Sequence, residues 1–225
     1  MSGLVNSPPG GGTENASGII VRVRPLTETS LVIHWLSPEL GRLATVAKGA
    51  RRPKSPLRGK LDVFFEADFS FARSRRSELH RLREVVVRET HEPLRRELAR
   101  LRQVAYAAAL IEQTTEPATP LPAITGLFVS FVRWVSGTEP RARHVLAFEL
   151  RLLRELGLAP DAGESRLNPA ARELLAQLTE VPWAELGALR PEPGTARAVR
   201  QFLHGFLVYQ FGRLAAGRAA ALGAG

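Results

Sequence analysis

Apolar and polar residues alternate in several short segments before residue 93, which is the pattern of β-strands with one buried face. The first segment, GIIVRVRPL from Gly18, is predicted to carry Ile19, Val21 and Val23 on one face and Ile20, Arg22 and Arg24 on the other. SLVIHWLS and RLATVAK predict two further strands. LDVFFEADFSFA is the most regular, with alternate residues from Leu61 to Phe71 on one face. ELHRLREVVVRE predicts a less regular fifth strand that ends before the break at residues 91–93.

Beyond residue 93 the apolar positions recur at helical spacing. In LRRELARLRQVAYAAALIEQ the predicted apolar face consists of Leu94, Leu98, Leu101, Ala105 and Ala108. Two more helices are predicted in LFVSFVRWVSG and ARHVLAFELRLLRELG. The second is apolar on most sides and is therefore predicted to lie centrally in the bundle. Gly157 is its predicted C-cap. Asn168 and Pro169 open another helix, and TARAVRQFLHGFLVYQFGRLAAGRAAAL predicts one long final helix.

These patterns divide the chain into three parts. Residues 1–17 are rich in Gly, Ser, Pro and Asn and are expected to form a disordered leader. Five strands joined by short turns predict a small closed barrel such as the OB-fold over residues 18–92. Residues 93–225 are expected to form a helical bundle. The predicted fold class is therefore α+β, with an N-terminal barrel and a C-terminal helical domain.

The composition narrows the class of partner. The 225 residues include 31 Lys plus Arg against 22 Asp plus Glu, a net charge of +9, which favours polyanions or acidic protein tails. The absence of cysteine excludes disulfides, thiolate zinc sites and cysteine nucleophiles. The N-terminal sequence lacks the pattern of a signal peptide and no run of 18 apolar residues occurs, so a cytoplasmic location and no membrane contact are expected.

The segment VAKGARRPKSPLRGK, residues 46–60, has six cations, no acidic residue, and glycines and prolines that disfavour a helix. It contains the only three lysines of the chain, Lys48, Lys54 and Lys60. A solvated charge run explains about half of such loops, but a loop between two barrel strands is also where small barrels bind nucleic acid. The candidate nucleic-acid-binding residues of this loop are Lys48, Arg51, Arg52, Lys54, Arg58 and Lys60. The first strand adds Arg22 and Arg24, and the turn after the fourth strand adds Arg73, Arg75 and Arg76.

Other motifs have simpler explanations than a functional site. Trp35 could stack on an unpaired base, but a core role is favoured by about two to one because aromatic residues dominate small cores. GARRPKS lacks the phosphate-binding pattern G-x-x-x-x-G-K-[ST], HEPLR is not H-E-x-x-H, and no G-x-S-x-G occurs. Glu66 and Asp68 are expected to be solvated or salt-bridged rather than an acid/base pair. No catalytic residue, metal, cofactor or small-molecule substrate is predicted.

The helical part offers a second kind of site. Its candidate residues for a protein partner are Arg141, Arg143, Arg151 and Arg154, on or beside a largely apolar helix. Such a mixture could bind an acidic peptide that ends in hydrophobic residues. Arginines that merely cover a core helix would give the same pattern, so both interpretations stay open.

Several of these segments resemble the bacterial DNA repair protein family RecO. The similarity lies in the first strands, in VAKGARRPKS, and in AFELRLLRELGLAPD, and it extends from Gly18 to about Asp161, with YQFGR near the end compatible. The resemblance implies an OB-fold followed by a helical domain that binds single- and double-stranded DNA and anneals strands. It also implies RecR and the C-terminal tail of single-strand-binding protein as partners, and a role in loading RecA at gaps.

Many members of this family carry a four-cysteine zinc module after the corresponding helix. Here the segment reads DAGESRLN and contains no cysteine, so the module is expected to be reduced to a loop without zinc. The resemblance implies a non-enzymatic, nucleoid-associated protein. Two alternatives remain: an RNA-binding or ribosome-associated barrel, and a protein adaptor that binds no nucleic acid.

Overall fold

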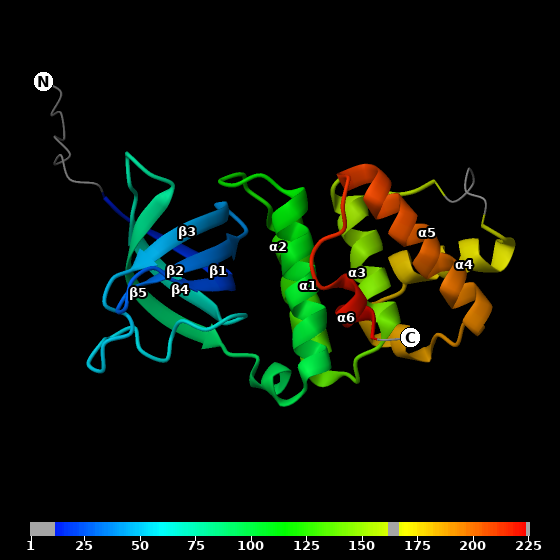
Figure 1. Cartoon of the computed structure of the whole chain (residues 1–225), viewed down its shortest axis with the longest axis horizontal. Coiled ribbons are helices and arrows are strands. Elements are labelled where there is room, and N and C mark those ends of the chain that lie inside the picture. The colour runs from blue at the N-terminus through cyan, green and yellow to red at the C-terminus, as the bar shows by residue number, and fades with distance from the viewer. Residues whose placement is uncertain (1–11, 162–166, 224–225) are drawn as a thin grey trace, which may run out of the picture. The chain divides into compact units, whose positions relative to one another are not determined.

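The chain contains a strand-rich part and a helical part. The computed structural model describes residues 12–161 and 167–223, and the chain divides into two compact units, Met1–Thr90 and His91–Gly225. Figure 1 shows strands in the first unit and helices in the second. This confirms the predicted α+β class, and the division lies close to the boundary predicted after residue 92.

The first unit is a closed five-stranded barrel. Its strands are β1 (Thr13–Pro25), β2 (Leu31–Ser37), β3 (Gly41–Ala47), β4 (Glu66–Ala72) and β5 (Leu79–Glu89), in the order β1-β2-β3-β5-β4. All neighbouring strands are antiparallel except β3 and β5, which run parallel. The long strand β1 closes the barrel because its first half pairs with β4 and its second half with β2. This is the OB-fold arrangement that the sequence predicted.

Strand β1 begins earlier than the sequence predicted. Residues 13–17 had been assigned to a disordered leader, but they form a ladder with β4 in which Thr13 pairs with Ala72 and Ser17 with Asp68. Backbone hydrogen bonding to a neighbouring strand, not side-chain hydrophobicity, explains this polar extension. At Gly18 the strand changes partner, and an added Cβ would lie 2.7 Å from the carbonyl oxygen of Leu36. The predicted leader over residues 1–11 lies outside the described residues.

Two irregularities correct the predicted strand faces. A register shift between Ile20 and Arg22 changes the phase of β1, so that Ile20 and Val23 both contact the barrel core. The predicted fourth strand begins only at Glu66, because Phe64 adopts a left-handed conformation with φ 66°. The amide of Phe64 donates to the carbonyl of Ile20 at 2.7 Å, which ties this bend to β1.

The barrel core contains Trp35. Its ring is fully buried and stacks on Phe69 with a centroid distance of 4.0 Å. Its indole Nε1 donates to the hydroxyl of Thr45 at 2.9 Å, so its polar atom is satisfied inside the barrel. The structure therefore confirms the core interpretation of Trp35, and this ring is not exposed for base stacking.

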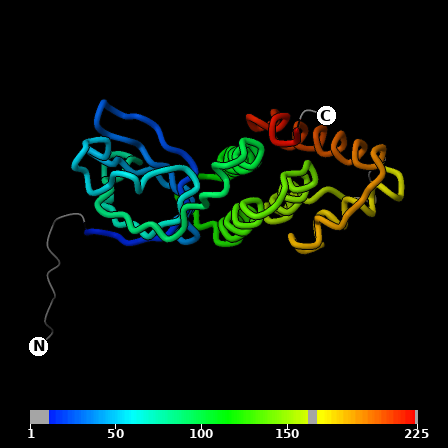
Figure 2. Tube along the Cα trace, turned by 90° about the horizontal axis from the view of Figure 1, so that it is seen from below, coloured from blue at the N-terminus to red at the C-terminus, as the bar shows by residue number. Residues whose placement is uncertain are grey.

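The second unit is built from helices. They are η1 (Glu92–Arg96), α1 (Leu98–Thr114), α2 (Pro122–Gly137), α3 (Ala142–Glu155), α4 (Pro169–Glu180), η2 (Trp183–Ala188), α5 (Pro193–Phe211) and α6 (Arg218–Leu222). Helix α3 packs against α1, α2, α4 and α6, and every residue from His144 to Leu153 is buried, which confirms its central position. In the rotated view of Figure 2 the orange and red C-terminal helices follow one another along one edge of this unit.

The predicted helix ends of this unit are largely correct. The side chain of Asn168 accepts a hydrogen bond from the amide of Ala171 at 2.9 Å, as expected of an N-cap before Pro169. Gly157 is left-handed with φ 70° and follows α3 as a terminating glycine. The predicted long final helix is wrong: it breaks at Gly212, with φ 72°, into α5 and the short α6.

The predicted apolar face of the first helix is wrong at two of its five positions, whereas Leu94 and Ala108 are buried and Leu101 is half-buried. Leu98 is 60% exposed and Ala105 is exposed, whereas Gln103, Val104 and Tyr106 are buried. Tyr106 is buried because it belongs to a polar cluster inside the helical unit. The Tyr106 hydroxyl donates to Glu149 at 2.5 Å, and Arg218 from α6 donates to both oxygens of the same carboxylate at 2.7 and 2.8 Å. Within the described residues none of the helices combines the length and apolar character needed to cross a bilayer.

Candidate nucleic-acid interface

The loop between β3 and β4 is held in a defined shape despite its many glycines and prolines. Successive tight turns are closed by backbone hydrogen bonds from Arg52 to Gly49 at 3.0 Å and from Ser55 to Arg52 at 3.0 Å. Ala50 and Leu57 are buried in the barrel core and anchor the loop at two points. The amide of Arg51 also donates to the carbonyl of Thr29 in the β1–β2 turn at 3.0 Å. The loop is therefore an ordered scaffold for its charged side chains.

The six cations of this loop are predominantly exposed; we call them the loop cations. Those that are exposed are Lys48, Arg51, Arg52, Lys54 and Arg58, while Lys60 is half-buried. Within residues 12–161 and 167–223 none of the six forms an ion pair, although Arg58 donates to the carbonyl of Pro53 at 3.2 Å. Their charge is therefore not cancelled by neighbouring carboxylates, which suits the binding of an external polyanion.

A second group of cations lies across the outer face of the sheet. In the strand register Arg22 of β1 lies opposite His34 of β2. One continuous row of register partners crosses four strands and consists of Arg24, Val32, Val46 and Arg81. Directly paired residues share a face, so the row brings Arg24 and Arg81 to the same side. Arg42 lies close enough to influence His34 as well. We call Arg22, Arg24, Arg42 and Arg81 the sheet arginines.

The local charge explains the state of His34. Burial lowers the pKa of this imidazole, and the positive charges of Arg22, Arg24 and Arg42 lower it further. At neutral pH His34 is therefore uncharged and contributes hydrogen-bonding capacity rather than charge. Burial likewise lowers the pKa of Arg22, with the repulsion of Arg24 and Arg42 as secondary causes.

The structure does not bring the predicted turn arginines to the loop. Arg75 and Arg76 are exposed in the β4–β5 turn, which precedes Leu79, the partner of Ala44. The cationic loop instead follows Ala47, at the other end of β3, and β3 and β5 run parallel. Arg73 forms a two-point ion pair with Glu14, with both distances 2.7 Å, so its charge is already compensated.

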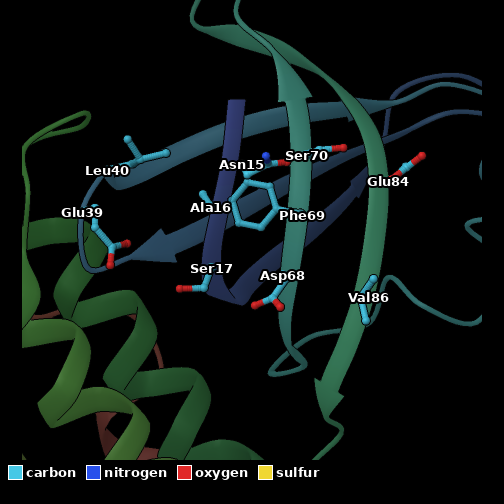
Figure 3. Close-up of a pocket in the computed structure, with 10 residues that line it drawn as sticks. All are labelled: Asn15, Ala16, Ser17, Glu39, Leu40, Asp68, Phe69, Ser70, Glu84 and Val86. Atoms are coloured by element: carbon cyan, nitrogen blue, oxygen red, sulfur yellow. The ribbon is translucent and has the colours of Figure 1, made fainter. Parts of the chain in front are cut away.

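One hollow of the barrel surface is lined by acidic side chains. This hollow of about 520 Å³ is bordered by β1, β4, β5 and the β2–β3 turn, and it contains Glu39, Asp68 and Glu84. Figure 3 shows these carboxylates around the hollow together with Ser17 and Ser70. Asp68 forms an ion pair with Arg88, as expected for a surface carboxylate rather than an acid/base group. This hollow would repel phosphates, so the loop and the sheet arginines are the more favourable surface for nucleic acid.

The helical unit contains a groove where two of the predicted partner-binding arginines meet. The groove has a volume of about 770 Å³, and apolar side chains of α3 and α4, including Leu146, Leu174 and Leu178, form its floor. Its cations are Arg141, Arg143, Arg190, Arg197 and Arg200, of which Arg141 forms an ion pair with Glu139. Arg143 donates to the carbonyls of Leu186 and Leu189, which holds it in place. We call this the arginine groove.

The other two predicted partner-binding arginines lie outside the arginine groove. Arg151 is buried: its guanidinium lies 4.0 Å from the Trp183 ring centroid and donates to the carbonyls of Leu178 and Val181. Burial lowers its pKa. Arg154 forms an ion pair with Glu180 at 2.9 Å. The predicted four-residue site is thereby reduced to Arg141 and Arg143, and the sequence pattern did not reveal Arg190, Arg197 and Arg200.

A buried histidine lies beside the same arginines. His144 is 1% exposed, its ring meets Trp134 edge-on at 4.0 Å, and its Nδ1 has no hydrogen-bond partner among the described residues. Burial lowers the pKa of His144 to about 3, and the charges of Arg143 and Arg141 act in the same direction. His144 borders a smaller hollow that shares Arg141, Arg143 and Arg190 with the arginine groove. In the described part of the chain no three His, Asp or Glu side chains gather as metal ligands.

Comparisons with known proteins agree with this architecture. Two family models match the chain, "Recombination protein O N terminal" over residues 13–91 and "Recombination protein O C terminal" over residues 95–165. The chain belongs to the RecO family. The first match begins at the residue where β1 begins, and the two matches lie in the barrel and in the helical unit.

Curated relatives of the chain carry the name "DNA repair protein RecO". The protein of Rhodopirellula baltica is 30% identical over 142 residues, 63% of this chain and 53% of the relative. That of Exiguobacterium sibiricum is 31% identical over 150 residues, 65% of this chain and 58% of the relative. The chain thus spans little more than half the length of these two. The protein of Anaeromyxobacter dehalogenans strain 2CP-C is 28% identical over 236 residues, 90% of this chain and 93% of the relative.

The expected loss of the zinc module falls on the segment Asp161–Asn168. Residues 162–166 lie outside the described residues, so the short loop expected there stays a prediction. The sequence itself contains no cysteine, so the four thiolates of such a module are absent from this RecO chain.

Proposed function

We propose that this RecO protein acts in DNA repair as a recombination mediator. It would bind single- and double-stranded DNA, anneal complementary strands, and help to load RecA at gaps covered by single-strand-binding protein. Membership of the family supports the repair role. The single observation that carries the DNA-binding proposal is the ordered β3–β4 loop, whose cations are exposed and unopposed by carboxylates.

The proposed binding is electrostatic. Lysine and arginine side chains that approach a phosphate backbone release condensed counterions, which gives affinity without reading the base sequence. The turns of the loop fix the starting points of these side chains, so less conformational entropy is lost on binding than with a flexible tail. The sheet arginines would extend the contact onto the barrel face.

The proposed annealing activity follows from the same charge. Two complementary strands repel each other through their phosphates, and a cationic surface that holds both lowers this repulsion. The loop cations and the sheet arginines supply two neighbouring cationic regions on one barrel. No covalent bond is made or broken in this process, so the proposed function needs no catalytic residue, metal or cofactor.

The arginine groove is proposed as the site for the C-terminal tail of single-strand-binding protein. An acidic peptide that ends in hydrophobic residues needs an apolar floor beside cations, and Leu146, Leu174 and Leu178 lie beside five arginines there. RecR is proposed as a second protein partner on the basis of family membership alone. The charge reversal Arg197→Glu should weaken a tail peptide in a fluorescence-anisotropy titration, while Arg102→Glu, on an exposed position of α1 outside the groove, should not.

The annealing assay tests this function as a whole. Complementary strands coated with single-strand-binding protein should anneal faster with the wild-type protein than without it. A variant with all six loop cations replaced by glutamine should lose this acceleration. The proposal would be contradicted if the wild-type protein left the annealing rate unchanged, or if the variant annealed as fast as the wild type.

Two alternative functions give different results. An RNA-binding barrel would prefer an RNA oligonucleotide over DNA of the same sequence in a competition experiment. An adaptor that binds only proteins would retain single-strand-binding protein after nuclease treatment and bind no oligonucleotide at low salt. The unopposed loop cations suit a phosphate backbone and an acidic protein tail alike, so these two experiments decide between the nucleic-acid-binding functions and the pure adaptor.

A further inference from the structure

Helix α5 (orange in Figure 1) presents two differently built surfaces. Arg197 and Arg200, near its start, line the arginine groove. A separate groove of about 540 Å³ lies along a different side of α5 and is bordered by Phe202, Phe206 and Tyr209. These residues are spaced by four and three positions, so they form one stripe along the helix. We call this second surface the aromatic groove.

The aromatic groove exposes rings that a folded protein normally buries. Tyr209 is 84% exposed, and the partly buried rings of Phe202 and Phe206 lie 5.9 Å apart between centroids. Between them on the stripe stands Gly205, where an added Cβ would meet nothing within 4 Å. Packing therefore does not require glycine here, and its lack of a side chain leaves the groove open. A glycine inside a helix is destabilising by about 1 kcal/mol relative to alanine. Gly205 therefore lowers the stability of α5 without improving its packing.

The charge around the aromatic groove indicates what could occupy it. From Pro193 to the end of the sequence there is no aspartate or glutamate, so α5 itself carries no negative side chain. Arg213 is exposed just beyond Tyr209. At the other border, Nε of Arg172 donates to the carbonyl of Leu167, a residue that lines the groove, at 2.9 Å. Exposed aromatic rings beside arginines are the features of surfaces that stack unpaired bases and hold their phosphates.

We propose that the aromatic groove of α5 stacks unpaired bases of single-stranded nucleic acid, with Tyr209 as its most accessible ring. Bases in a duplex are already stacked on one another, so this surface would select single strands. The proposal rests on the nucleic-acid-binding function above for its ligand class. Its mode of binding differs, because stacking depends on bases whereas the loop cations depend on phosphates.

The test compares two single strands of equal charge, an oligothymidine and an abasic strand of the same length. In an anisotropy titration at fixed salt, Tyr209→Ala should weaken binding of oligothymidine about tenfold, because the loss of one stacking ring affects single-strand binding on this scale. Binding of the abasic strand and of a duplex should change less than twofold. Tyr209→Phe should retain the wild-type affinity because it keeps the ring. Tyr209 is exposed, so the alanine variant should fold normally.

A second pair of variants fills the groove from Gly205. Gly205→Glu adds a side chain and a negative charge where there is free space, and it should weaken oligothymidine binding more than Gly205→Gln, which adds nearly the same volume without charge. Equal binding of oligothymidine by the wild type, Tyr209→Ala and Gly205→Glu proteins would overturn the proposal. So would a wild-type dimer in sedimentation that Tyr209→Ala dissociates, because the stripe would then be an interface between two copies.

The two proposals fail in different ways. If wild-type protein binds oligothymidine and the abasic strand equally well, and the loop variant still loses both, the stacking proposal is wrong and the phosphate-binding function stands. If wild-type protein binds neither strand at low salt, both proposals are wrong.

Discussion

The barrel and the helical unit both contain many cations, but they hold them differently. In the barrel loop, Arg51 and Arg52 are exposed on hydrogen-bonded turns and form no ion pair among the described residues. In the helical unit, Arg151 and Arg218 are 7% and 5% exposed, and their guanidinium groups donate to carbonyls or to the carboxylate of Glu149. The first group is available to an external ligand and the second group is part of the fold.

This difference shows why net charge alone does not locate a binding surface. The formal charge of +9 counts Arg218 and Arg51 equally. A buried arginine that is paired with a carboxylate contributes little potential outside the protein, whereas an exposed one beside no carboxylate contributes fully. The comparison predicts a clean separation: replacing a buried arginine should cost stability without affecting DNA binding, and replacing a loop cation should do the opposite.

The largest expected effect on stability comes from the buried pair of Arg218 and Glu149. Arg218→Met leaves a buried carboxylate whose remaining partner is the Tyr106 hydroxyl, and we expect the free energy of unfolding to fall by about 3–5 kcal/mol. Urea denaturation followed by circular dichroism measures this. Burial and the negative charge of Glu149 both raise the pKa of Tyr106, so this tyrosine stays protonated and keeps its hydrogen bond to the carboxylate in the variant.

The double variant Arg218→Met with Glu149→Leu serves as the control. Removing both charges together eliminates the unpaired carboxylate, so the double variant should be more stable than Arg218→Met alone. If the single variant lost less than about 1 kcal/mol, the description of Arg218 as a structural cation would be wrong.

The next effect is a dependence of stability on pH that originates at His144. Its pKa is lowered from an ordinary value near 6.5 to about 3 in the folded state. Between about pH 6.5 and pH 3, His144 is protonated in the unfolded chain but not in the folded chain. Lowering the pH through this window therefore favours the unfolded chain, and the free energy of unfolding falls. The loss amounts to at most about 1.4 kcal/mol per pH unit. His144→Phe should flatten this part of the curve of unfolding free energy against pH, and an unchanged curve would show that His144 is not held neutral.

The smallest effect is expected at Arg73. This arginine belongs to the predicted nucleic-acid-binding set, but its guanidinium is occupied by Glu14 at the barrel surface. Arg73→Gln should change the free energy of unfolding by no more than about 1 kcal/mol, the range of exposed ion pairs. It should change DNA affinity less than Arg51→Gln does in the same titration. A larger loss of affinity from Arg73→Gln would mean that DNA displaces Glu14.

Much of this arrangement follows from local sequence signals. The cationic loop, the Asn168 cap, the Gly157 terminator and the order of strands and helices could be predicted because each depends on neighbouring residues. The bulge after Ile20 and the left-handed Phe64 could not, because both arise where β1 meets strands distant in sequence. The same holds for Thr13–Ser17, a polar stretch that becomes a strand only through its pairing with β4.

The candidate sites divide in the same way. The sequence identified the loop cations from composition alone, but it could not show that Arg24 and Arg81 share one row, because this depends on the parallel pairing of β3 and β5. Nor could it separate Arg143, which lines the arginine groove, from Arg151, which packs on Trp183. Nor does the helical spacing of Phe202, Phe206 and Tyr209 show that this stripe is exposed, because exposure depends on which face of α5 packs on the other helices.

The salt dependence of DNA binding tests the central claim most directly. The logarithm of the binding constant should fall linearly with the logarithm of salt concentration for the wild-type protein. If the loop supplies about four phosphate contacts, replacing Lys48, Arg51, Arg52, Lys54, Arg58 and Lys60 with glutamine should flatten this slope by about 3–4 on duplex DNA, and by less on single strands. Replacing only the three lysines with arginine keeps the charge and should leave the slope unchanged. A glutamine variant that retains the wild-type slope would contradict the claim that the loop cations hold the phosphate backbone.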